Sequence, residues 1–340
     1  VIAKWYGGLI DPIMDSRALG LVTLLLIVVA MLGAVALFVV EAVPFKMLPY
    51  DNKSEMQVVI DMPEGTDLFV TANLAHRLGT ELKAVPEVAA FQTYVGTSSP
   101  FNFNGLVRHY FLRAQPWQGD IAVQLLDKKQ RHRSSHEIAA EVRETLTPIA
   151  ASVGARLTIA EAPPGPPVLA PVVVELYGPT PEIRRKVAAD VMAILKKTPN
   201  VADVGTYLEA PHDDIQFEVD RMKAGLYGVS VEDVNRELKM ATGGFEVGPL
   251  AGGMELEQTV IVLQVPLSTR VNLGNLLVLP IRNQAGVSVP LGELGRFVRR
   301  PVAPPIWHKD LRPLEYVTAD VIGRLGAPLY GMMAVDAALK

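Results

Sequence analysis

Few side chains in this sequence have the types and spacing that catalysis or metal binding requires. The histidines are the first candidates. His132 and His136 lie four residues apart, which places two potential metal ligands on one face of a helix. No third ligand lies nearby in the sequence, so we expect a solvated, basic helix start there. Scattered methionines could line a site for a soft cation, but filling of cores and loops explains them better.

Catalytic patterns are also missing from the sequence. It has no GxSxG, HExxH or GxxxxGK[ST] motif, and cysteine is absent, which excludes disulfides, Cys-ligated zinc and Cys nucleophiles. We therefore predict no cofactor, no metal site and no enzyme activity. The formal net charge of −4 comes with no basic patch, so a nucleic-acid partner is not expected either.

One segment concentrates aromatic rings beside positive charge. Residues 99–117 carry Phe101, Phe103 and three further aromatic residues together with two arginines and a histidine. Phe101 and Phe103 share one face if the segment is extended, and Gly105 permits a bend at little steric cost. Such a loop can present an adaptable aromatic surface to an apolar ligand. The alternative is a strand edge whose phenylalanines fill a core.

The elements that must position this segment begin with a membrane span. Residues 18–40 carry no charge, and Thr23 is their one polar side chain. At ~1.5 Å per residue the run is about 34 Å long, enough to cross a hydrocarbon core. A cleaved signal peptide would have a shorter apolar stretch. Residues 1–17 alternate apolar and charged positions at helical spacing, which is typical of a helix lying on the membrane surface.

An internal repeat organises the chain after the span. Residues 59–94 align without gaps with residues 172–207, and both copies have the pattern of a strand, a helix and a strand. The identical pairs are Val59/Val172, Gly65/Gly178, Ala75/Ala188, Leu82/Leu195, Lys83/Lys196, Pro86/Pro199, Val88/Val201, Ala89/Ala202, Thr93/Thr206 and Tyr94/Tyr207.

The first copy continues with a strand at 120–127, a helix at 134–151 and a strand at 155–161. Ser134 and Glu137 fit a capping box at the start of that helix. The resulting βαβ–βαβ order predicts a split βαβ or ferredoxin-like sandwich. The prolines of residues 162–171 then end the domain, because they can continue neither a ladder nor a helix.

The second copy is interrupted by a glycine-rich stretch. Short strands are predicted at 215–220, 259–267, 276–281 and 287–294, with a helix at 230–241. A linker at 304–314, a strand at 315–322 and a helix at 329–340 follow. By analogy with the first copy a final strand should come next, so we expect this sequence to be a piece truncated at its C-terminus.

In this order, the features resemble the second periplasmic loop of the resistance–nodulation–division (RND) efflux transporters, which follows their seventh transmembrane helix. The resemblance is carried by LPYDNKSEMQVVIDMPEGT at 48–66, PPGPPVLAPVVVELYG at 163–178 and VDRMKAGLYGVSVEDVNREL at 219–238. It covers essentially the whole chain. Together with the residue patterns, it implies an α+β chain with one transmembrane helix and two ferredoxin-like porter subdomains. The expected divisions are an interfacial segment at 1–17, a transmembrane helix at 18–42, porter subdomains at 52–165 and at 166–210 with 304–340, and a docking subdomain at 211–303.

The resemblance also implies a function. Family members are inner-membrane subunits of proton-driven efflux pumps, some of them for multiple drugs, and form homotrimers with a periplasmic adaptor and an outer-membrane channel. Residues after about 42 are then expected in the periplasm, with membrane lipid and a small-molecule substrate as further partners. Phe101, Phe103 and Gly105 fall where drug-exporting members have a flexible substrate loop. Asn102 and Asn104 make this loop more polar than an apolar drug gate.

Two further expectations follow from the span. It contains no acidic residue, so no proton path is expected within this piece. The alternative function is a single-span, membrane-anchored periplasmic binding or scaffold protein built on the same sandwich.

Overall fold

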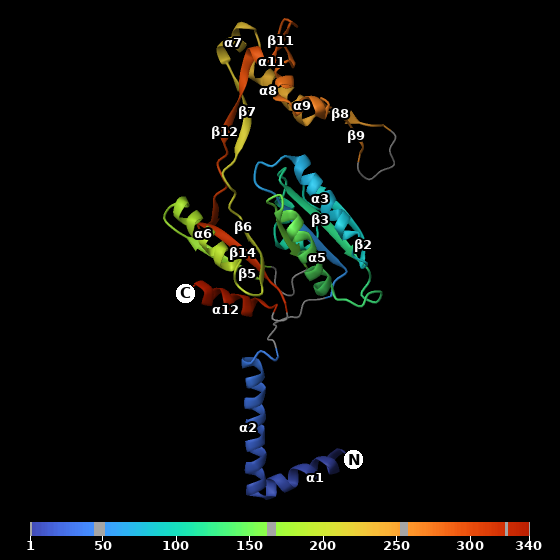
Figure 1. The fold of residues 1–340 in the computed structure, drawn as a ribbon, viewed down its shortest axis with the longest axis vertical. Coiled ribbons are helices and arrows are strands. Elements are labelled where there is room, and N and C mark those ends of the chain that lie inside the picture. Colours follow the sequence, from blue (N-terminus) through green and yellow to red (C-terminus); the bar gives the residue numbers. More distant parts are fainter. Residues whose placement is uncertain (1, 44–51, 162–167, 252–257, 324–325, 340) are drawn as a thin grey trace. The chain divides into compact units, whose positions relative to one another are not determined.

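The computed structural model describes residues 2–43, 52–161, 168–251, 258–323 and 326–339 (Figure 1). The chain divides into two compact units, one formed by Val1–Ala210 with Pro304–Lys340 and the other by Pro211–Ala303. Residues 162–167 of the proline segment and the first residues of the 48–66 motif lie outside the described residues, as do residues 252–257.

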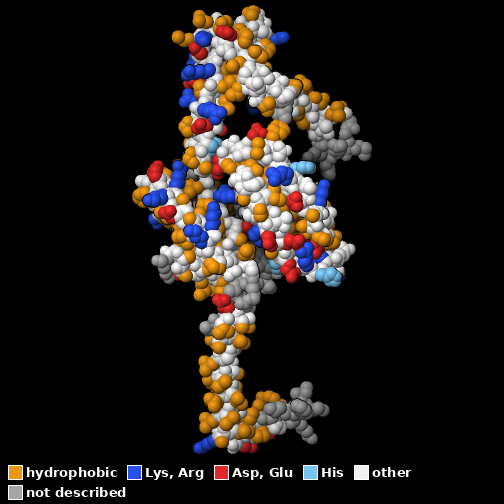
Figure 2. All heavy atoms as spheres, in the orientation of Figure 1, with side chains coloured by type: hydrophobic (Ala, Val, Ile, Leu, Met, Phe, Trp, Pro, Cys, Tyr) orange, Lys and Arg blue, Asp and Glu red, His pale blue; other side chains and the backbone are white. Residues whose placement is uncertain are grey.

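The N-terminal region of the first unit is helical. Helix α1 spans Ile2–Asp15 and α2 spans Arg17–Val39, within a residue of the predicted span. Among the described residues, Arg17–Leu37 is the one helical stretch long and apolar enough to cross a membrane, and none of its most apolar window is buried. Figure 2 shows hydrophobic side chains along this helix. The hydroxyl of Thr23 donates a hydrogen bond to Leu19 O (2.9 Å), so this polar group is satisfied inside the helix.

Residues 55–160 form the first sandwich, a sheet with helices on one face. The sheet has the order β2-β3-β1-β4 and its neighbouring strands are antiparallel. Both helices begin at capping side chains: Asp67 accepts a hydrogen bond from Phe69 N, and Ser134 and Glu137 form the predicted capping box. The elements are β1 (Glu55–Asp61), α3 (Leu68–Leu82), β2 (Val88–Val95), β3 (Gln118–Leu125), α5 (Ser135–Ala151) and β4 (Arg156–Ala160).

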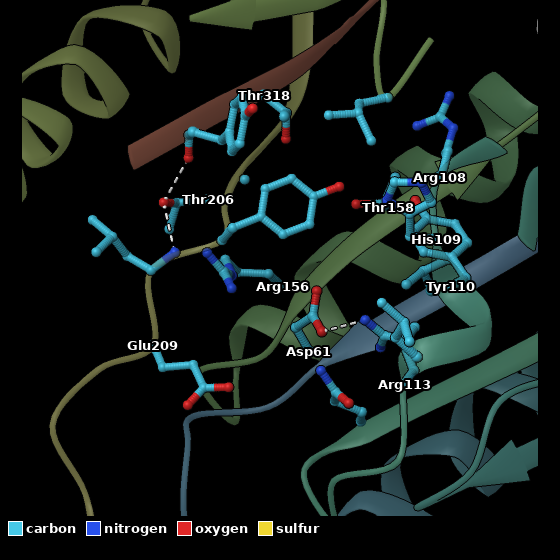
Figure 3. Close-up of a pocket in the computed structure, with 18 of the residues that line it drawn as sticks. Asp61, Arg108, His109, Tyr110, Arg113, Arg156, Thr158, Thr206, Glu209 and Thr318 are labelled. Carbon is cyan, nitrogen blue, oxygen red and sulfur yellow. Dashed lines mark hydrogen bonds and ion pairs between the residues drawn. The ribbon is translucent and has the colours of Figure 1, made fainter. Parts of the chain in front are cut away.

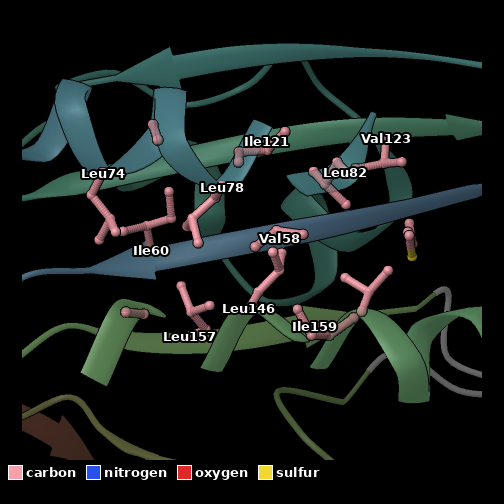
Figure 4. Close-up of a cluster of buried hydrophobic side chains, with 14 of the residues drawn as sticks. Val58, Ile60, Leu74, Leu78, Leu82, Ile121, Val123, Leu146, Leu157 and Ile159 are labelled. Carbon is pink, nitrogen blue, oxygen red and sulfur yellow. The ribbon is translucent and has the colours of Figure 1, made fainter. Parts of the chain in front are cut away.

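The core of the first sandwich lies between the sheet and these helices (Figure 4). Val58 and Ile60 of β1 pack there against Leu78 of α3 and Leu146 of α5, all of them almost fully buried. Since successive strand residues point to opposite faces, the alternate positions Val59 and Asp61 are left for the other side of the sheet. That second face forms the site described below.

The second sandwich is assembled from residues 172–206 and 307–339. Strand β14 pairs with β5, β6 and β13, so the order β6-β14-β5 matches β2-β3-β1 of the first sandwich. Residues 304–314 were expected to be a linker, which is wrong: they contribute a hairpin that extends the sheet. The elements are β5 (Val172–Tyr177), α6 (Pro181–Leu195), β6 (Val201–Thr206), β13 (Trp307–Lys309), β14 (Arg312–Val321) and α12 (Pro328–Leu339).

The second unit has its own core, which includes Val234, Ile281, Leu291 and Leu294. Its helix α8 begins with a capping box formed by Ser230 and Asp233. The strands predicted at 276–281 and 287–294 are too long: the first begins inside the helix Leu273–Leu277 and is a strand only from Pro280, and the second half of the other is the helix Leu291–Leu294. The elements are β7 (Asp213–Val219), α7 (Arg221–Leu226), α8 (Val231–Gly243), β8 (Phe245–Pro249), β9 (Val260–Leu263), α9 (Leu267–Arg270), α10 (Leu273–Leu277), β10 (Pro280–Arg282), β11 (Ser288–Pro290), α11 (Leu291–Leu294) and β12 (Gly295–Pro301).

Candidate functional site

A cavity of about 400 Å³ lies between the two sandwiches of the first unit (Figure 3). The first sandwich contributes the helix-free face of its sheet and the β2–β3 connection, which we define as residues 96–117. That connection contains the short helix α4 (Phe103–Val107) and the 3₁₀ turn η1 (Tyr110–Leu112). The second sandwich contributes β6, β14 and the segment that leads into β13.

Strand alternation explains which side chains line the cavity. On β14, Val317, Ala319 and Val321 enter the core of the second sandwich, so Thr318 and Asp320 lie on the side of the cavity. The lining combines aromatic and charged groups. Its aromatic members include Tyr110, Trp117, Tyr207, Trp307 and Tyr316, and its charged members include Asp61, Glu64, Arg108, Arg113, Arg156, Asp203, Glu209 and Asp320.

Arg113 anchors the end of the β2–β3 connection to the sheet. Its guanidinium donates to Asp61 Oδ1 at 2.8 Å and to Asp120 Oδ1 at 3.1 Å, and also to the carbonyl of Ile60 at 2.6 Å. Asp120 is fully buried and accepts a further hydrogen bond from Ser99 N at the start of the connection. One arginine and one aspartate therefore hold both ends of the connection against the sheet.

Two arginine–aspartate pairs join the sandwiches to each other. Arg108 donates to both carboxylate oxygens of Asp320, at 3.2 and 3.3 Å, and both residues are more than nine-tenths buried. Arg143 of α5 donates to both oxygens of Asp203 on β6, at 2.9 and 2.8 Å. Bidentate pairing fixes orientation as well as distance, so these pairs define how the two sandwiches meet.

The charged groups change the ionisation of their neighbours. Burial opposes the charge on Arg108, but Asp320 more than offsets that effect and raises the pKa of Arg108 above its ordinary value. Removal of water from around the hydroxyl raises the pKa of Tyr110 to about 12. Tyr110 is therefore a neutral hydroxyl donor at physiological pH.

Aromatic rings gather on the opposite wall of the cavity. Tyr207 lies 5.3 Å from Trp307 and 5.8 Å from Tyr316 between ring centroids. The indole N–H of Trp307 donates to the carbonyl of Tyr207 at 3.3 Å, which fixes the ring. Such a wall offers apolar surface and polar tips to a ligand with both characters.

The three residues predicted for a substrate loop all lie in the β2–β3 connection. The segment is not extended there, because Asn102 caps a helix that begins at Phe103: its side chain accepts a hydrogen bond from Gly105 N at 2.6 Å. Neither phenylalanine fills the core. Phe101 is 77% exposed and stacks on Phe111 at 5.6 Å, and Phe103 is 48% exposed.

Phe103 borders a second cavity, of about 260 Å³, which is rich in side-chain amides. Asn104 lines it and is buried; its amide nitrogen donates to the carbonyl of Ala160 at 3.4 Å, while its Oδ1 has no hydrogen-bond partner among the described residues. This placement separates the predicted loop residues: Phe103 lies beside the amide cavity, and Phe101 and Gly105 are absent from the lining of either cavity described here.

The histidines do not form a metal centre in the described part of the chain. His136 Nδ1 lies 2.7 Å from Glu161 Oε1, but no group of three or more His, Cys, Asp or Glu side chains able to hold a metal ion occurs among the described residues. Three carboxylates of the main cavity, Asp61, Asp203 and Asp320, are engaged by arginines.

Sequence reasoning missed the arginine–aspartate pairs. Arg108 and Asp320 are 212 residues apart, so no local pattern connects them. One signal was available: β14 alternates core residues with Thr318 and Asp320, and a buried carboxylate needs a cation or a ligand beside it.

The sequence profile of the AcrB/AcrD/AcrF family matches residues 1–328. Among curated proteins, the chain is similar to the nickel and cobalt resistance protein CnrA of Cupriavidus metallidurans, with 30% identity over 158 residues, or 45% of this chain and 14% of that protein. The cobalt-zinc-cadmium resistance protein CzcA of the same organism is 25% identical over 158 residues. The aligned 158 residues thus cover about one-seventh of these relatives, 14–15% of their length.

The fold of this chain is also similar to the folds of solved structures. Two crystal forms of a heavy metal efflux pump superpose with TM-scores of 0.63 and 0.64 at 19% sequence identity. The superpositions cover 99% of this chain and 34–35% of those chains. Since the family profile extends over nearly the whole sequence, the chain belongs to the AcrB/AcrD/AcrF family of RND permeases.

Proposed function

We propose that this chain is part of the inner-membrane permease of an RND efflux system, and that the cavity between the two sandwiches is part of its substrate path. The observation that carries the proposal is the family match over residues 1–328, within which the cavity combines an aromatic wall with buried charges. Ligand sites in proteins are concave and mostly apolar, with a few well-placed polar groups, and this cavity fits that description. The proposed role is transport and not enzyme catalysis.

Under this proposal, each segment of the chain has its own role in the pump. Residues 1–17 lie at the membrane surface and residues 18–42 cross the inner membrane, which places the rest in the periplasm. The sandwiches at 52–165 and at 166–210 with 304–340 form the porter, and residues 211–303 dock toward an outer-membrane channel. The assembled pump is a proton-driven homotrimer with a periplasmic adaptor.

The first candidate substrates are divalent metal cations. Similar proteins are named for resistance to nickel, cobalt, zinc and cadmium, and similar solved structures are of a heavy metal efflux pump. In the main cavity a cation would have to compete with Arg113 for Asp61, whose side chain is 28% exposed and faces the cavity.

A second candidate is an organic compound with apolar and polar parts, as expected for a multidrug pump. The aromatic wall of Tyr207, Trp307 and Tyr316 favours it, as does the engagement of Asp61, Asp203 and Asp320 by arginines. In this case Phe101, Phe103 and Gly105 belong to a substrate-contacting loop beside the cavity.

Expression of the full-length gene in a host without its own efflux pumps tests the proposal. Growth is measured against nickel, cobalt, zinc and cadmium salts and against a panel of dyes and antibiotics, with and without a protonophore. Resistance to the metals that the protonophore abolishes supports the first candidate, and resistance confined to organic compounds supports the second. Resistance to neither, with the protein present in the membrane, contradicts the efflux proposal.

A pair of variants tests the cavity itself. Thr318→Trp places a large ring against the cavity wall and is expected to abolish resistance. Val278→Trp, at a position 73% exposed in the second unit, adds the same ring elsewhere and serves as the matched control. Wild-type resistance in Thr318→Trp at equal expression would show that the substrate does not use this cavity.

A further inference from the structure

The two walls of the main cavity differ in charge. Among the described residues that line it, those of the second sandwich include three carboxylates, Asp203, Glu209 and Asp320, and neither lysine nor arginine. The lining arginines all belong to the first sandwich. The second wall also carries the cluster of three rings around Tyr207, so it combines negative charge with aromatic surface.

Most charges of the cavity are already neutralised by neighbouring groups. The two arginine–aspartate pairs that join the sandwiches cancel their own charges. On the first wall, Asp61 and Asp120 share Arg113, and Arg156 lies directly opposite Asp61 on strand β4. Directly opposite residues have Cβ atoms roughly 4.5–5.5 Å apart, so Arg156 supplies the second positive charge for these two carboxylates.

Two lining carboxylates remain without such a partner. Within the described part of the chain, neither Glu64 nor Glu209 forms an ion pair. Glu64 lies in the turn between β1 and α3 of the first sandwich, and Glu209 follows β6 of the second. The lining therefore has an excess of negative charge, and a concave site with low-dielectric walls strengthens the attraction of such charges for a cation.

Glu209 lies on the same short segment as the aromatic wall (Figure 3). It follows Tyr207 by two residues, and Thr206 fixes the turn that carries both. The hydroxyl of Thr206 donates to the carbonyl of Tyr316 at 2.9 Å and accepts a hydrogen bond from Leu208 N at 3.1 Å. One carboxylate and a ring cluster are thus presented to the cavity by a segment that is held in place.

A divalent metal ion does not match this arrangement. Zinc, nickel and cobalt are held by several converging side-chain ligands, and no three such side chains converge among the residues that the structure describes. An ammonium group needs only one charge partner and the faces of aromatic rings, of which tryptophan and tyrosine are the best. The volume of about 400 Å³ is also that of a small-molecule site.

We propose that the second wall of the cavity binds an organic cation, an amine or quaternary ammonium on an apolar body. Glu209 is its charge partner, and Tyr207, Trp307 and Tyr316 are its aromatic contacts. The inference rests on the proposed function, because it takes the main cavity as part of the substrate path. It selects the organic candidate over the metal candidate, although similar proteins are named for metal resistance.

Two dyes with the same tricyclic ring system and opposite charge test the class of ligand. Binding of cationic rhodamine 6G and of anionic fluorescein to the purified full-length pump is followed by fluorescence polarisation. The parent protein is expected to bind rhodamine 6G more tightly by roughly tenfold or more. Glu209→Gln should weaken rhodamine 6G binding roughly 5- to 30-fold without weakening fluorescein binding, because it removes only the charge partner.

Glu246→Gln is the matched control, since it makes the same change at an exposed position on β8 of the second unit. Both dyes are expected to bind this variant as they bind the parent. Equal affinities of the parent for the two dyes, or equal weakening of both by Glu209→Gln, would overturn the assignment.

The aromatic contacts are tested separately from the charge. Tyr207→Leu keeps an apolar side chain but removes the ring, and should weaken rhodamine 6G binding more than Tyr207→Phe does. Equal affinities of these two folded variants would contradict the cation–π contact. Failure of the proposed function is distinguishable: a parent pump without any resistance contradicts efflux, whereas resistance to metals alone contradicts the organic cation and leaves efflux standing.

Discussion

At the scale of single residues, the ion pairs that line the cavity hold the β2–β3 connection in place. Arg113 forms ion pairs with both Asp61 and Asp120. The side chain of Arg113 is 10% exposed, that of Asp61 is 28% exposed and that of Asp120 is 0% exposed. Its third contact, to the carbonyl of Ile60, satisfies a backbone acceptor at the end of β1. Because Arg113 neutralises two carboxylates and fixes one end of the β2–β3 connection, we expect the stability of the first unit to depend on it.

Arg113→Ala is therefore expected to destabilise the first unit by about 3–5 kcal/mol, since it leaves a buried carboxylate without its cation. The measurement is thermal unfolding of the purified chain in detergent, followed by circular dichroism. Lys309→Ala removes an ion pair to Glu175 whose side chains are 46% and 30% exposed, and should leave the melting temperature nearly unchanged. Equal melting temperatures for both variants would contradict this ranking.

The exposed phenylalanines of the β2–β3 connection, in contrast to Arg113, are expected to contribute little to stability. Phe101→Ala and Phe103→Ala should each cost less than about 1 kcal/mol of stability, because exposed rings lose little burial on truncation. Leu78→Ala, at a fully buried position, should cost about 2–5 kcal/mol as a core reference. In the full-length pump, the phenylalanine variants should change the relative resistance to different substrates at equal expression. An unchanged profile for every substrate would exclude these rings from the transport path.

At the scale of elements, helix caps and hairpin turns fix local boundaries. Helices α3, α5, α6 and α8 each begin after a residue whose side chain caps them: Asp67, Ser134, Thr180 and Ser230. The β13–β14 hairpin departs from the preferred chemistry. Its turn residues, Asp310 and Leu311, have φ angles of 49° and 62°, where asparagine or aspartate followed by glycine is usual.

Leu311→Gly should consequently stabilise the hairpin. Leu311 is 97% exposed and loses no packing, and relief of its left-handed conformation outweighs the added flexibility of glycine, a net gain of about 0.5–1 kcal/mol. Leu311→Ala keeps the left-handed penalty and is the control without gain. Both variants are compared by denaturant unfolding. A loss of stability in Leu311→Gly would mean that the leucine makes a stabilising contact.

At the scale of the whole molecule, the chain is two units with separate cores. The second unit is entered and left through the paired strands β7 and β12, with Asp213 opposite Pro301. Opposite residues in antiparallel strands lie roughly 4.5–5.5 Å apart, so the two points of connection are close together. The cores of the two sandwiches and of the second unit share no buried residue among those described.

Removing residues 211–303 and joining 210 to 304 by a short Gly-Ser linker should therefore leave the first unit folded. The isolated second unit should fold as well. Circular dichroism and thermal melting of each piece, compared with the intact chain, measure this. Aggregation of the first unit after excision, or an unfolded second unit, would show that the cores depend on each other.

The sequence by itself determined the features that depend on local pattern. The uncharged run at residues 18–40 and the repeated strand–helix–strand pattern specify which groups avoid water, and capping residues satisfy the first backbone N–H groups of helices. Helices α2, α3, α5 and α6 and the sandwich strands other than β13 follow from them. The order of the sequence motifs at 48–66, 163–178 and 219–238 also indicated the RND family.

Tertiary structure alone decided the rest. Asn104 of helix α4 donates a hydrogen bond to Ala160 on β4, 56 residues away, so the position of this short helix on the sheet depends on a distant strand. The pairing of Arg108 with Asp320 across 212 residues is likewise invisible in the sequence. The physical reason is that periodicity records which face of an element is buried, whereas the partner that meets it is chosen only when the elements pack together.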